Sequence, residues 1–134
     1  MRPRIRYATA ADGARIAFWS LGEGRPLIYM TGGPWSHMEL WDIPECRQWY
    51  ERLSADRQVV RYDMRGTGLS QRDVADFSLE VQLGDVEAVV ETLAVPSFDL
   101  FAATDAGPVA IAYTAHHPEQ VTRLALWCGC GDAW

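Results

Sequence analysis

The sequence lacks a long hydrophobic run, and this absence argues against a membrane-spanning helix. No segment approaches the roughly 18 consecutive apolar residues that a bilayer requires. Hydrophobic residues still make up 49% of the 134 residues, which is enough for one compact core. The N-terminal stretch "MRPRIRYATA" has no apolar segment of the secretory type, so we expect one soluble domain in the cytoplasm.

Positive charge and cysteine are also scarce. The 12 basic residues are outnumbered by 18 acidic ones, and the net charge is -6. We expect no nucleic-acid partner, because binding to a phosphate backbone depends on clustered Lys and Arg. Cys46, Cys128 and Cys130 lack the Cys-x-x-Cys spacing of structural zinc sites. We therefore predict reduced, buried thiols and no metal.

Apolar runs alternate with segments of helical spacing. An antiparallel hairpin is predicted around Asp12-Gly13, since both residues tolerate positive φ. Later strands are predicted at "RPLIYMTGG", "QVVRYDMRG", "FDLFAA" and "RLALWC". Helices are predicted over 37–54 with a break at Pro44, from a capping Ser78 with acidic residues outward, and between the last two strands. This order predicts an α/β fold: a mostly parallel sheet of about six strands, with the hairpin first and helices on both faces.

Three turns at the carboxyl ends of predicted strands mark the edge where ligands bind such sheets. They are "TGGP", "DMRGTGLS" and "AATDAG". The second turn contains Gly66 and Gly68 but not the third glycine of the dinucleotide fingerprint, so we expect no nicotinamide cofactor, and no other cofactor is indicated. We expect Asp63 and Arg65 to hold this turn through a local ion pair.

Three segments resemble the N-terminal half of an α/β-hydrolase fold domain. "YMTGGPWSHMELW" stands in place of that family's His-Gly-Gly-Pro loop, and "VVRYDMRGTGLS" matches its Asp-x-Arg-Gly-x-Gly-x-Ser turn. "GPVAIAYTAHHPEQVTRLAL" matches its post-nucleophile helix and next strand. The chain is especially similar to hydrolase-like domains joined to bacterial adenylate cyclase or LuxR-type regulatory modules. The resemblance implies that residues 1–134 form a truncated α/β-hydrolase domain that contains the first six strands.

The resemblance places Thr104 where this family has its nucleophilic serine. Ala102 and Ala106 then occupy the two positions that must be small, because strand and helix backbones approach closely at this elbow. A threonine hydroxyl acts as a nucleophile when a base activates it; the alternative is a structural threonine at a degenerate elbow. Strain of about 1–3 kcal/mol on a β-branched residue there leaves a relaxed turn as a further alternative.

A second interpretation moves the nucleophile by one residue. Aspartate is the nucleophile in the dehalogenase and epoxide-hydrolase branches of the family, so Asp105 is a candidate. This shift makes "TDAG" the motif and breaks the match at Pro108. The bland alternative is that Asp105 caps the following helix, where the helix dipole stabilises a carboxylate. The register favours Thr104.

The resemblance implies an oxyanion hole, to which the turn "TGGP" would contribute one of the two backbone N–H groups. In the resembled family, backbone N–H groups would come from Asp105 and Gly33, with Gly32 as an alternate donor. Gly32, Gly33, Pro34 and His37 are the candidate substrate-binding residues, and a tight turn without a binding role is the alternative. Thr31 replaces the usual histidine, which removes one orienting imidazole.

The chain alone supplies no complete catalytic triad, because the acid and the histidine follow the sixth strand in this fold. His37, His116 and His117 are expected at the surface or at helix ends. Two functions stay open. One is a catalytically impaired domain with a pocket for a small apolar ligand or ester beside the elbow. The other is an ester-type hydrolase whose base comes from missing sequence or another subunit.

The last predicted strand, "VTRLALWCGC", is apolar on both faces. Strands of this kind have neighbours on each side and cover on each face. We therefore expect a missing C-terminal half or a second copy of the chain, as in a homo-oligomer, to cover it, with aggregation of the chain as the alternative.

Overall fold

The computed structural model describes residues 1–31 and 37–127, with residues 37–39 described in the backbone only. Six strands form one sheet in the order β1-β2-β4-β3-β5-β6. Their bounds are β1 Arg6–Thr9, β2 Arg15–Leu21, β3 Arg25–Thr31, β4 Arg57–Tyr62, β5 Phe98–Ala103 and β6 Val121–Trp127. The first three strands of this order are antiparallel, and β4, β3, β5 and β6 run parallel. The predicted mostly parallel sheet with an N-terminal hairpin is confirmed.

The hairpin forms where the sequence predicts it. Gly13 has a φ of 90°, a left-handed conformation that glycine adopts without a side-chain clash. The Asp12 carboxylate accepts a hydrogen bond from the Ala14 N–H at 3.1 Å, which closes the turn locally. The turn therefore fixes the pairing of Thr9 with Arg15 at the start of the ladder.

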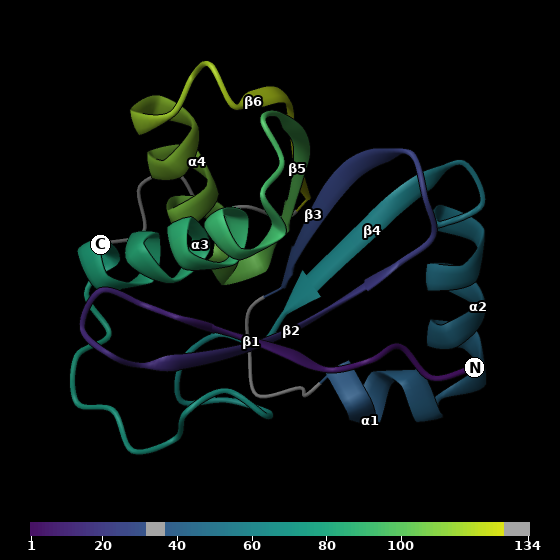
Figure 1. Ribbon diagram of the computed structural model, residues 1–134, viewed down its shortest axis with the longest axis horizontal. Coiled ribbons are helices and arrows are strands. Elements are labelled where there is room, and N and C mark those ends of the chain that lie inside the picture. Colours follow the sequence, from purple (N-terminus) through teal and green to yellow (C-terminus); the bar gives the residue numbers. More distant parts are fainter. Residues whose placement is uncertain (32–36, 128–134) are drawn as a thin grey trace.

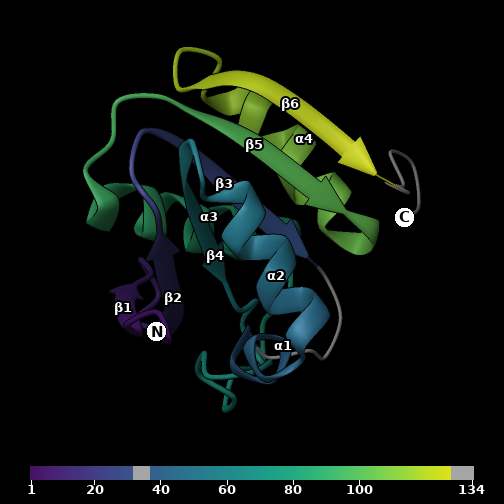
Figure 2. The same cartoon turned by 90° about the vertical axis from the view of Figure 1, so that its right-hand side faces the viewer.

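Helices cover both faces of the sheet, as predicted (Figures 1 and 2). On one face lie α1, His37–Asp42, and α2, Pro44–Leu53, which are separated at the predicted break before Pro44. On the opposite face lie α3, Leu79–Leu93, and α4, Gly107–His116. The connection from β3 to β4 moves one way along the sheet and the two later connections move the other way, so right-handed crossovers place their helices on opposite faces.

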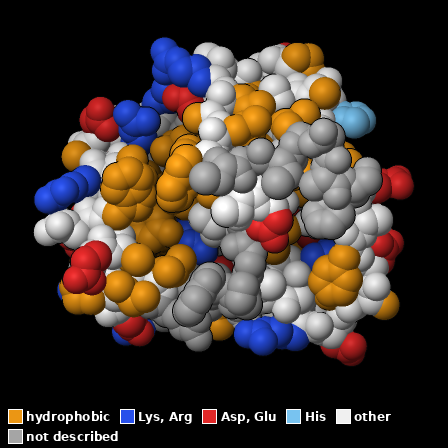
Figure 3. Space-filling model, turned by 180° about the vertical axis from the view of Figure 1, so that it is seen from behind, with side chains coloured by type: hydrophobic (Ala, Val, Ile, Leu, Met, Phe, Trp, Pro, Cys, Tyr) orange, Lys and Arg blue, Asp and Glu red, His pale blue; other side chains and the backbone are white. Residues whose placement is uncertain are grey.

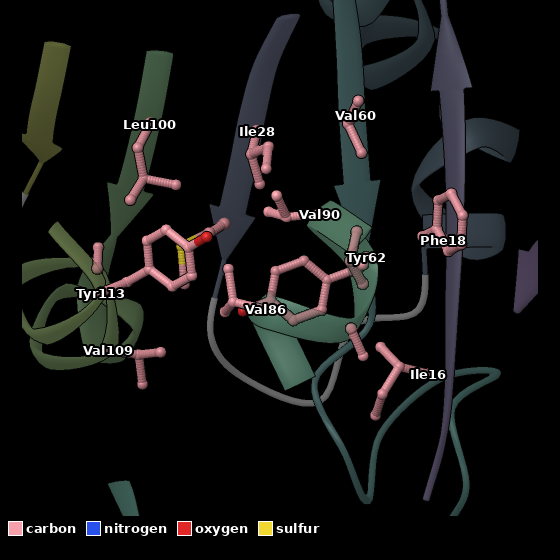
Figure 4. Close-up of a cluster of buried hydrophobic side chains, with 14 of the residues drawn as sticks. Ile16, Phe18, Ile28, Val60, Tyr62, Val86, Val90, Leu100, Val109 and Tyr113 are labelled. Atoms are coloured by element: carbon pink, nitrogen blue, oxygen red, sulfur yellow. The ribbon is translucent and has the colours of Figure 1, made fainter. Parts of the chain in front are cut away.

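The main core lies between the sheet and the α3/α4 layer (Figure 4). Val86 and Val90 of α3 point toward Ile28 and Val60 of the central strands, and all four are at most 5% exposed. Burial of each such side chain contributes roughly 1.5–3 kcal/mol, so this layer stabilises the sheet more than any single polar contact does.

A second, aromatic cluster holds α1 and α2 to the other face. The rings of Trp19 and Tyr50 meet edge to face with their centroids 5.1 Å apart, and Trp41 of α1 packs on Trp19 at 6.2 Å. Arg61 is 1% exposed and donates a hydrogen bond to the Tyr50 hydroxyl at 2.8 Å. The cluster therefore anchors these helices to β2 and β4.

Helix α3 corrects two expectations. Ser78 stands at its N-cap but its side chain makes no capping bond, and its N–H instead donates to the Asp76 carboxylate at 2.8 Å. Glu80, Glu87 and Glu91 are exposed as predicted, but Asp85 is buried. At the other end Ala94 adopts a left-handed conformation with φ 56°, the position that favours glycine.

Candidate functional site

The predicted elbow lies where β5 meets α4. The apolar strand ends at Ala103, a single 3-10 turn spans Thr104–Ala106, and α4 begins at Gly107. Ala102 and Ala106 are 0% and 1% exposed, because the strand and the helix pack closely at this corner. The two small residues thus lie in the core as the elbow interpretation requires.

Thr104 has a strained backbone. Its φ is 55°, and among the described non-glycine residues only Ala94 shares this sign. A β-branched side chain is disfavoured there because its Cβ substituents crowd the backbone. The relaxed turn considered for a threonine is therefore not observed. The strained residue of this turn is Thr104 and not Asp105.

The Thr104 hydroxyl bonds within its own turn. Its Oγ1 lies 2.8 Å from the Ala103 carbonyl oxygen and 2.9 Å from the Asp105 Oδ1. The hydroxyl has one proton, so it donates to one of these acceptors at a time. Both Thr104 and Asp105 are exposed, so the turn presents a hydroxyl and a carboxylate at the carboxyl end of β5.

The neighbouring strand brings the first predicted turn close to this elbow. Thr31, the last residue of β3, pairs in register with Ala103. The candidate residues Gly32, Gly33 and Pro34 follow directly and lie outside the described residues. His37 begins α1, but its side chain is also outside the described part. The oxyanion-hole pair of Asp105 and Gly33 therefore stays a prediction.

Ion pairs of Arg65 hold the turn after β4, but the predicted pairing of Arg65 with Asp63 is wrong. Arg65 is 3% exposed and binds Asp85 at 2.6 Å and Asp12 at 2.8 Å. The Asp63 carboxylate instead accepts the Leu69 N–H at 2.8 Å within the turn. Sequence reasoning missed Asp85, although its position four residues before the buried Val89 placed it on the inner face of α3.

The electrostatics of the Arg65 cluster follow from burial and pairing. Hydrogen bonds to Asp85 and Asp12 raise the pKa of the Arg65 guanidinium. Burial raises the pKa of the Asp85 carboxyl, and hydrogen bonds from Arg65 oppose that shift. The Arg65 hydrogen bond also lowers the pKa of Asp12. The cluster joins the hairpin, the β4 turn and α3, so its role is structural.

The two histidines with described side chains lie at the end of α4, as predicted. The Nδ1 of His116 is 2.7 Å from the Ala112 carbonyl oxygen, and the Nε2 of His117 is 2.9 Å from a Glu87 carboxylate oxygen. His117 also packs on Tyr113, and burial raises the pKa of the Tyr113 hydroxyl to about 12. Both imidazoles thus make contacts within or beside α4, at the end of the helix opposite Thr104.

The described part of the chain contains no cluster of His, Cys, Asp and Glu that is able to hold a metal ion. Cys46, the one cysteine within the described range, is half-buried and has a free thiol, while Cys128 and Cys130 lie outside that range. None of the described helices combines the length and the apolar character needed to cross a bilayer.

A cavity of about 350 Å³ lies on the α2 side of the sheet. Its apolar lining comes from β3, β5, β6 and α2, and includes Leu27, Tyr29, Trp49, Leu53, Phe101 and Ala125. Arg57 and Arg123 lie at its rim together with Asp99. None of these residues belongs to the three predicted turns, so sequence reasoning missed this cavity.

Curated relatives cover almost the whole chain. No family model matches it. It is 31% identical to a 2-hydroxymuconate semialdehyde hydrolase of Pseudomonas sp. (strain CF600) over 96% of the chain and 45% of that protein. It is 30% identical to the AB hydrolase superfamily protein YisY of Bacillus subtilis (strain 168), over 96% of the chain and 46% of YisY. The chain thus spans less than half the length of these relatives.

Solved structures agree with the sequence relatives. The esterase RhEst1 from Rhodococcus sp. ECU1013 superposes with a TM-score of 0.84 at 27% identity, over 95% of this chain and 46% of the esterase. Cfl2 from Burkholderia cenocepacia gives a TM-score of 0.80 at 27% identity, over 94% of this chain and 41% of Cfl2. The chain therefore has a truncated α/β-hydrolase fold, and the proteins that it resembles in sequence and structure are members of the α/β-hydrolase superfamily.

Proposed function

We propose that the chain is an α/β-hydrolase-like domain that is catalytically impaired on its own and binds a small apolar ligand or ester beside a degenerate elbow. The observation that carries this proposal is the contact set of Thr104. Its hydroxyl donates to a neighbouring carbonyl or to Asp105, and neither acceptor is an imidazole. A carboxylate is a weak general base toward an alcohol at neutral pH. Without a stronger base the hydroxyl stays protonated.

The described histidines support the same proposal. His116 and His117 bond to Ala112 and Glu87, at the opposite end of α4 from Thr104. The relatives that carry hydrolase or esterase names are about twice as long as this chain. In this proposal a base would come only from sequence beyond residue 134 or from another subunit.

The strain at Thr104 favours a second candidate function, an active ester-type hydrolase. Thr104 is held at φ 55°, the backbone geometry of a nucleophile elbow, even though a β-branched side chain disfavours this conformation. In this alternative Thr104, or Asp105, attacks an ester carbonyl, and the N–H groups of Asp105 and Gly33 bind the oxyanion. The base is supplied from outside the chain.

Hydrolysis of p-nitrophenyl acetate tests the choice between these functions. We expect no turnover by the purified chain above the buffer rate, and no change in Thr104→Ala or Thr104→Ser. The control is Thr114→Ala, which removes a hydroxyl that bonds within α4. Turnover that Thr104→Ala abolishes and Thr114→Ala preserves would establish the alternative.

The remaining parts of the proposal concern the setting of the domain. We propose a cytoplasmic protein without a nucleic-acid partner, whose domain is completed by a C-terminal half or by a second copy of the chain. A regulatory module of the adenylate cyclase or LuxR type is the proposed output partner. If the chain purifies as a monomer with no associated protein, this result would count against completion of the domain by a second copy.

A further inference from the structure

Two arginines lie side by side at the amino ends of the central strands, at the edge of the sheet opposite the elbow. Arg25 is the first residue of β3 and Arg57 is the first residue of β4, and strand register places them directly opposite each other. Like charges in directly opposite positions on neighbouring strands destabilise a sheet. An anion between the two guanidinium groups would remove this repulsion.

The carboxylates that pair with these arginines do not neutralise them fully. Asp99 of β5 is 9% exposed, and its carboxylate is shared by Arg25 at 3.0 Å and Arg123 at 3.5 Å. Asp56 pairs with Arg57 at 3.1 Å, but its side chain is 76% exposed, so water weakens this pair. Asp99 therefore fixes the position of Arg25 and leaves positive charge at this edge.

The guanidinium groups keep hydrogen-bond donors for a ligand. A guanidinium carries five N–H groups in a planar fork, which matches the two oxygens of a carboxylate. The Oδ1 of Asp99 is buried and accepts no hydrogen bond from the described residues, so its contact with Arg25 is an ion pair without an aligned hydrogen bond. Arg57 uses its Nε for Asp56. Both arginines therefore have N–H groups left for a second carboxylate.

The cavity of about 350 Å³ begins beside this charged edge. Arg57, Asp99 and Arg123 line it, and its other lining residues are apolar or aromatic. The rings of Tyr29 and Phe101, which stack with centroids 4.8 Å apart, belong to this apolar lining. Figure 3 shows hydrophobic side chains gathered on this side of the molecule, with basic side chains at their upper edge. A positive end and an apolar interior of this size fit a small amphiphilic anion.

We propose that the cavity and the charged edge form a binding site for a carboxylate with an apolar chain, such as a medium-chain fatty acid. The carboxylate binds between Arg25 and Arg57, and the chain lies in the cavity against Tyr29 and Phe101. This site goes beyond the proposed function, because it lies at the amino ends of β3 and β4, whereas Thr104 follows the carboxyl end of β5. The domain would then bind a ligand at each edge of its sheet.

Isothermal titration calorimetry of the chain with decanoate and with decanamide tests the site. The two probes have the same apolar chain, and only decanoate carries a charge. We expect saturable binding of decanoate at a single site, with an affinity about fivefold higher than that of decanamide, which is the upper range for a partly exposed ion pair. High salt should remove most of this difference, because salt screens exposed charges.

Matched variants test the two parts of the site. Arg25→Gln and Arg57→Gln should each weaken the binding of decanoate about fivefold and leave that of decanamide unchanged. Arg4→Gln, an exposed change with the same loss of charge, should affect neither probe. Ala125→Trp should abolish the binding of both probes, because its indole fills the cavity, whereas Ala115→Trp on the exposed surface of α4 should not.

Several results would overturn the proposal. They are equal affinities for the two probes, a decanoate affinity that Arg25→Gln and Arg57→Gln both leave unchanged, and no decanoate binding by a chain that circular dichroism shows to be folded. Binding that Thr104→Trp removes and Ala125→Trp preserves would place the ligand beside the elbow instead, and would equally overturn it. Failure of the proposed function is seen separately, as ester turnover that depends on Thr104.

Discussion

Thr104 combines a left-handed backbone with a β-branched side chain. The elbow imposes φ 55° because β5 must turn at once into α4, and packing of the buried Ala102 and Ala106 fixes both elements around it. Strain of this kind is of order 1–3 kcal/mol, and the core must offset it. The strain at the elbow therefore lowers the free energy of unfolding, whether or not the hydroxyl reacts.

Replacing Thr104 by glycine should stabilise the protein. Glycine removes the strain but adds about 0.5–1 kcal/mol of chain entropy to the unfolded state, so we expect a net gain of about 1 kcal/mol in the free energy of unfolding. Urea unfolding followed by circular dichroism measures it. The control Thr114→Gly, inside α4, should lower stability instead. Equal losses in both variants would contradict a strained Thr104.

Asp85 is the second residue whose environment has a measurable consequence. Asp85→Asn removes the buried partner of Arg65, whose remaining carboxylate, Asp12, is half-exposed. Breaking this buried ion pair leaves the Arg65 charge with only the half-exposed Asp12 to compensate it, so we expect a loss of about 3 kcal/mol in the free energy of unfolding, measured by thermal or urea unfolding. Asp12→Asn should cost less, because water reaches that carboxylate. If Asp85→Asn leaves the free energy of unfolding unchanged, Arg65 must have found another partner.

At the scale of elements, helix α3 has its glycine in the wrong place for stability. Gly84 lies inside the helix, and a Cβ built there meets no atom within 4 Å. Ala94 ends the helix in the left-handed conformation that suits glycine. An exchange of the two residue types would match each position to its backbone.

Gly84→Ala and Ala94→Gly should therefore each raise the free energy of unfolding by about 0.5–1 kcal/mol. The positions are more than two helical turns apart, so the double variant should show additive effects. Thermal unfolding of the two single variants and the double variant checks this. Destabilisation by Gly84→Ala would mean that its Cβ does meet a neighbour.

The elements were predictable where a local pattern decides them. Apolar runs and the Asp12-Gly13 turn predicted the hairpin and the parallel strands, and Pro44 marked the break between α1 and α2. The Asp85 ion pair was not predicted, because charge on a helix is usually solvated and the partner, Arg65, is distant in sequence. The strain at Thr104 was left open, since a β-branched residue at an elbow is compatible either with strain or with a relaxed turn.

The candidate site was predictable in position more than in contacts. The carboxyl ends of parallel strands lie at one edge of the sheet, and the observed strand order places the ends of β3 and β5 side by side there. Which hydroxyl or carboxylate bonds to which acceptor depends on rotamers that no spacing encodes. The cavity on the α2 side was also missed, because it arises from strands separated by most of the chain.

At the scale of the whole molecule, the free edge of the sheet carries exposed apolar side chains. In the described structure β6 pairs with β5 alone, and Leu126 and Trp127 are 45% and 63% exposed. Such an edge is a template for pairing with another strand. Self-association of the isolated chain is the expected result.

Charge placed on this edge should suppress that association. We expect Leu126→Lys combined with Trp127→Glu to lower the apparent mass in light scattering at high protein concentration, with little change in the free energy of unfolding, because both side chains are exposed. Glu119→Lys, an exposed change before β6, is the control. Unchanged association in the edge variant would place the contact elsewhere.

The position of β3 in the sheet also affects the order in which the strands are able to pair during synthesis. Its first partner, β4, follows after one short pair of helices, whereas its other partner, β5, begins only at Phe98. During synthesis the half with the tryptophan cluster is therefore able to assemble while the rest is still being translated. The strained corner at Thr104 closes later than this half, because it forms only after β5 and the start of α4 have left the ribosome.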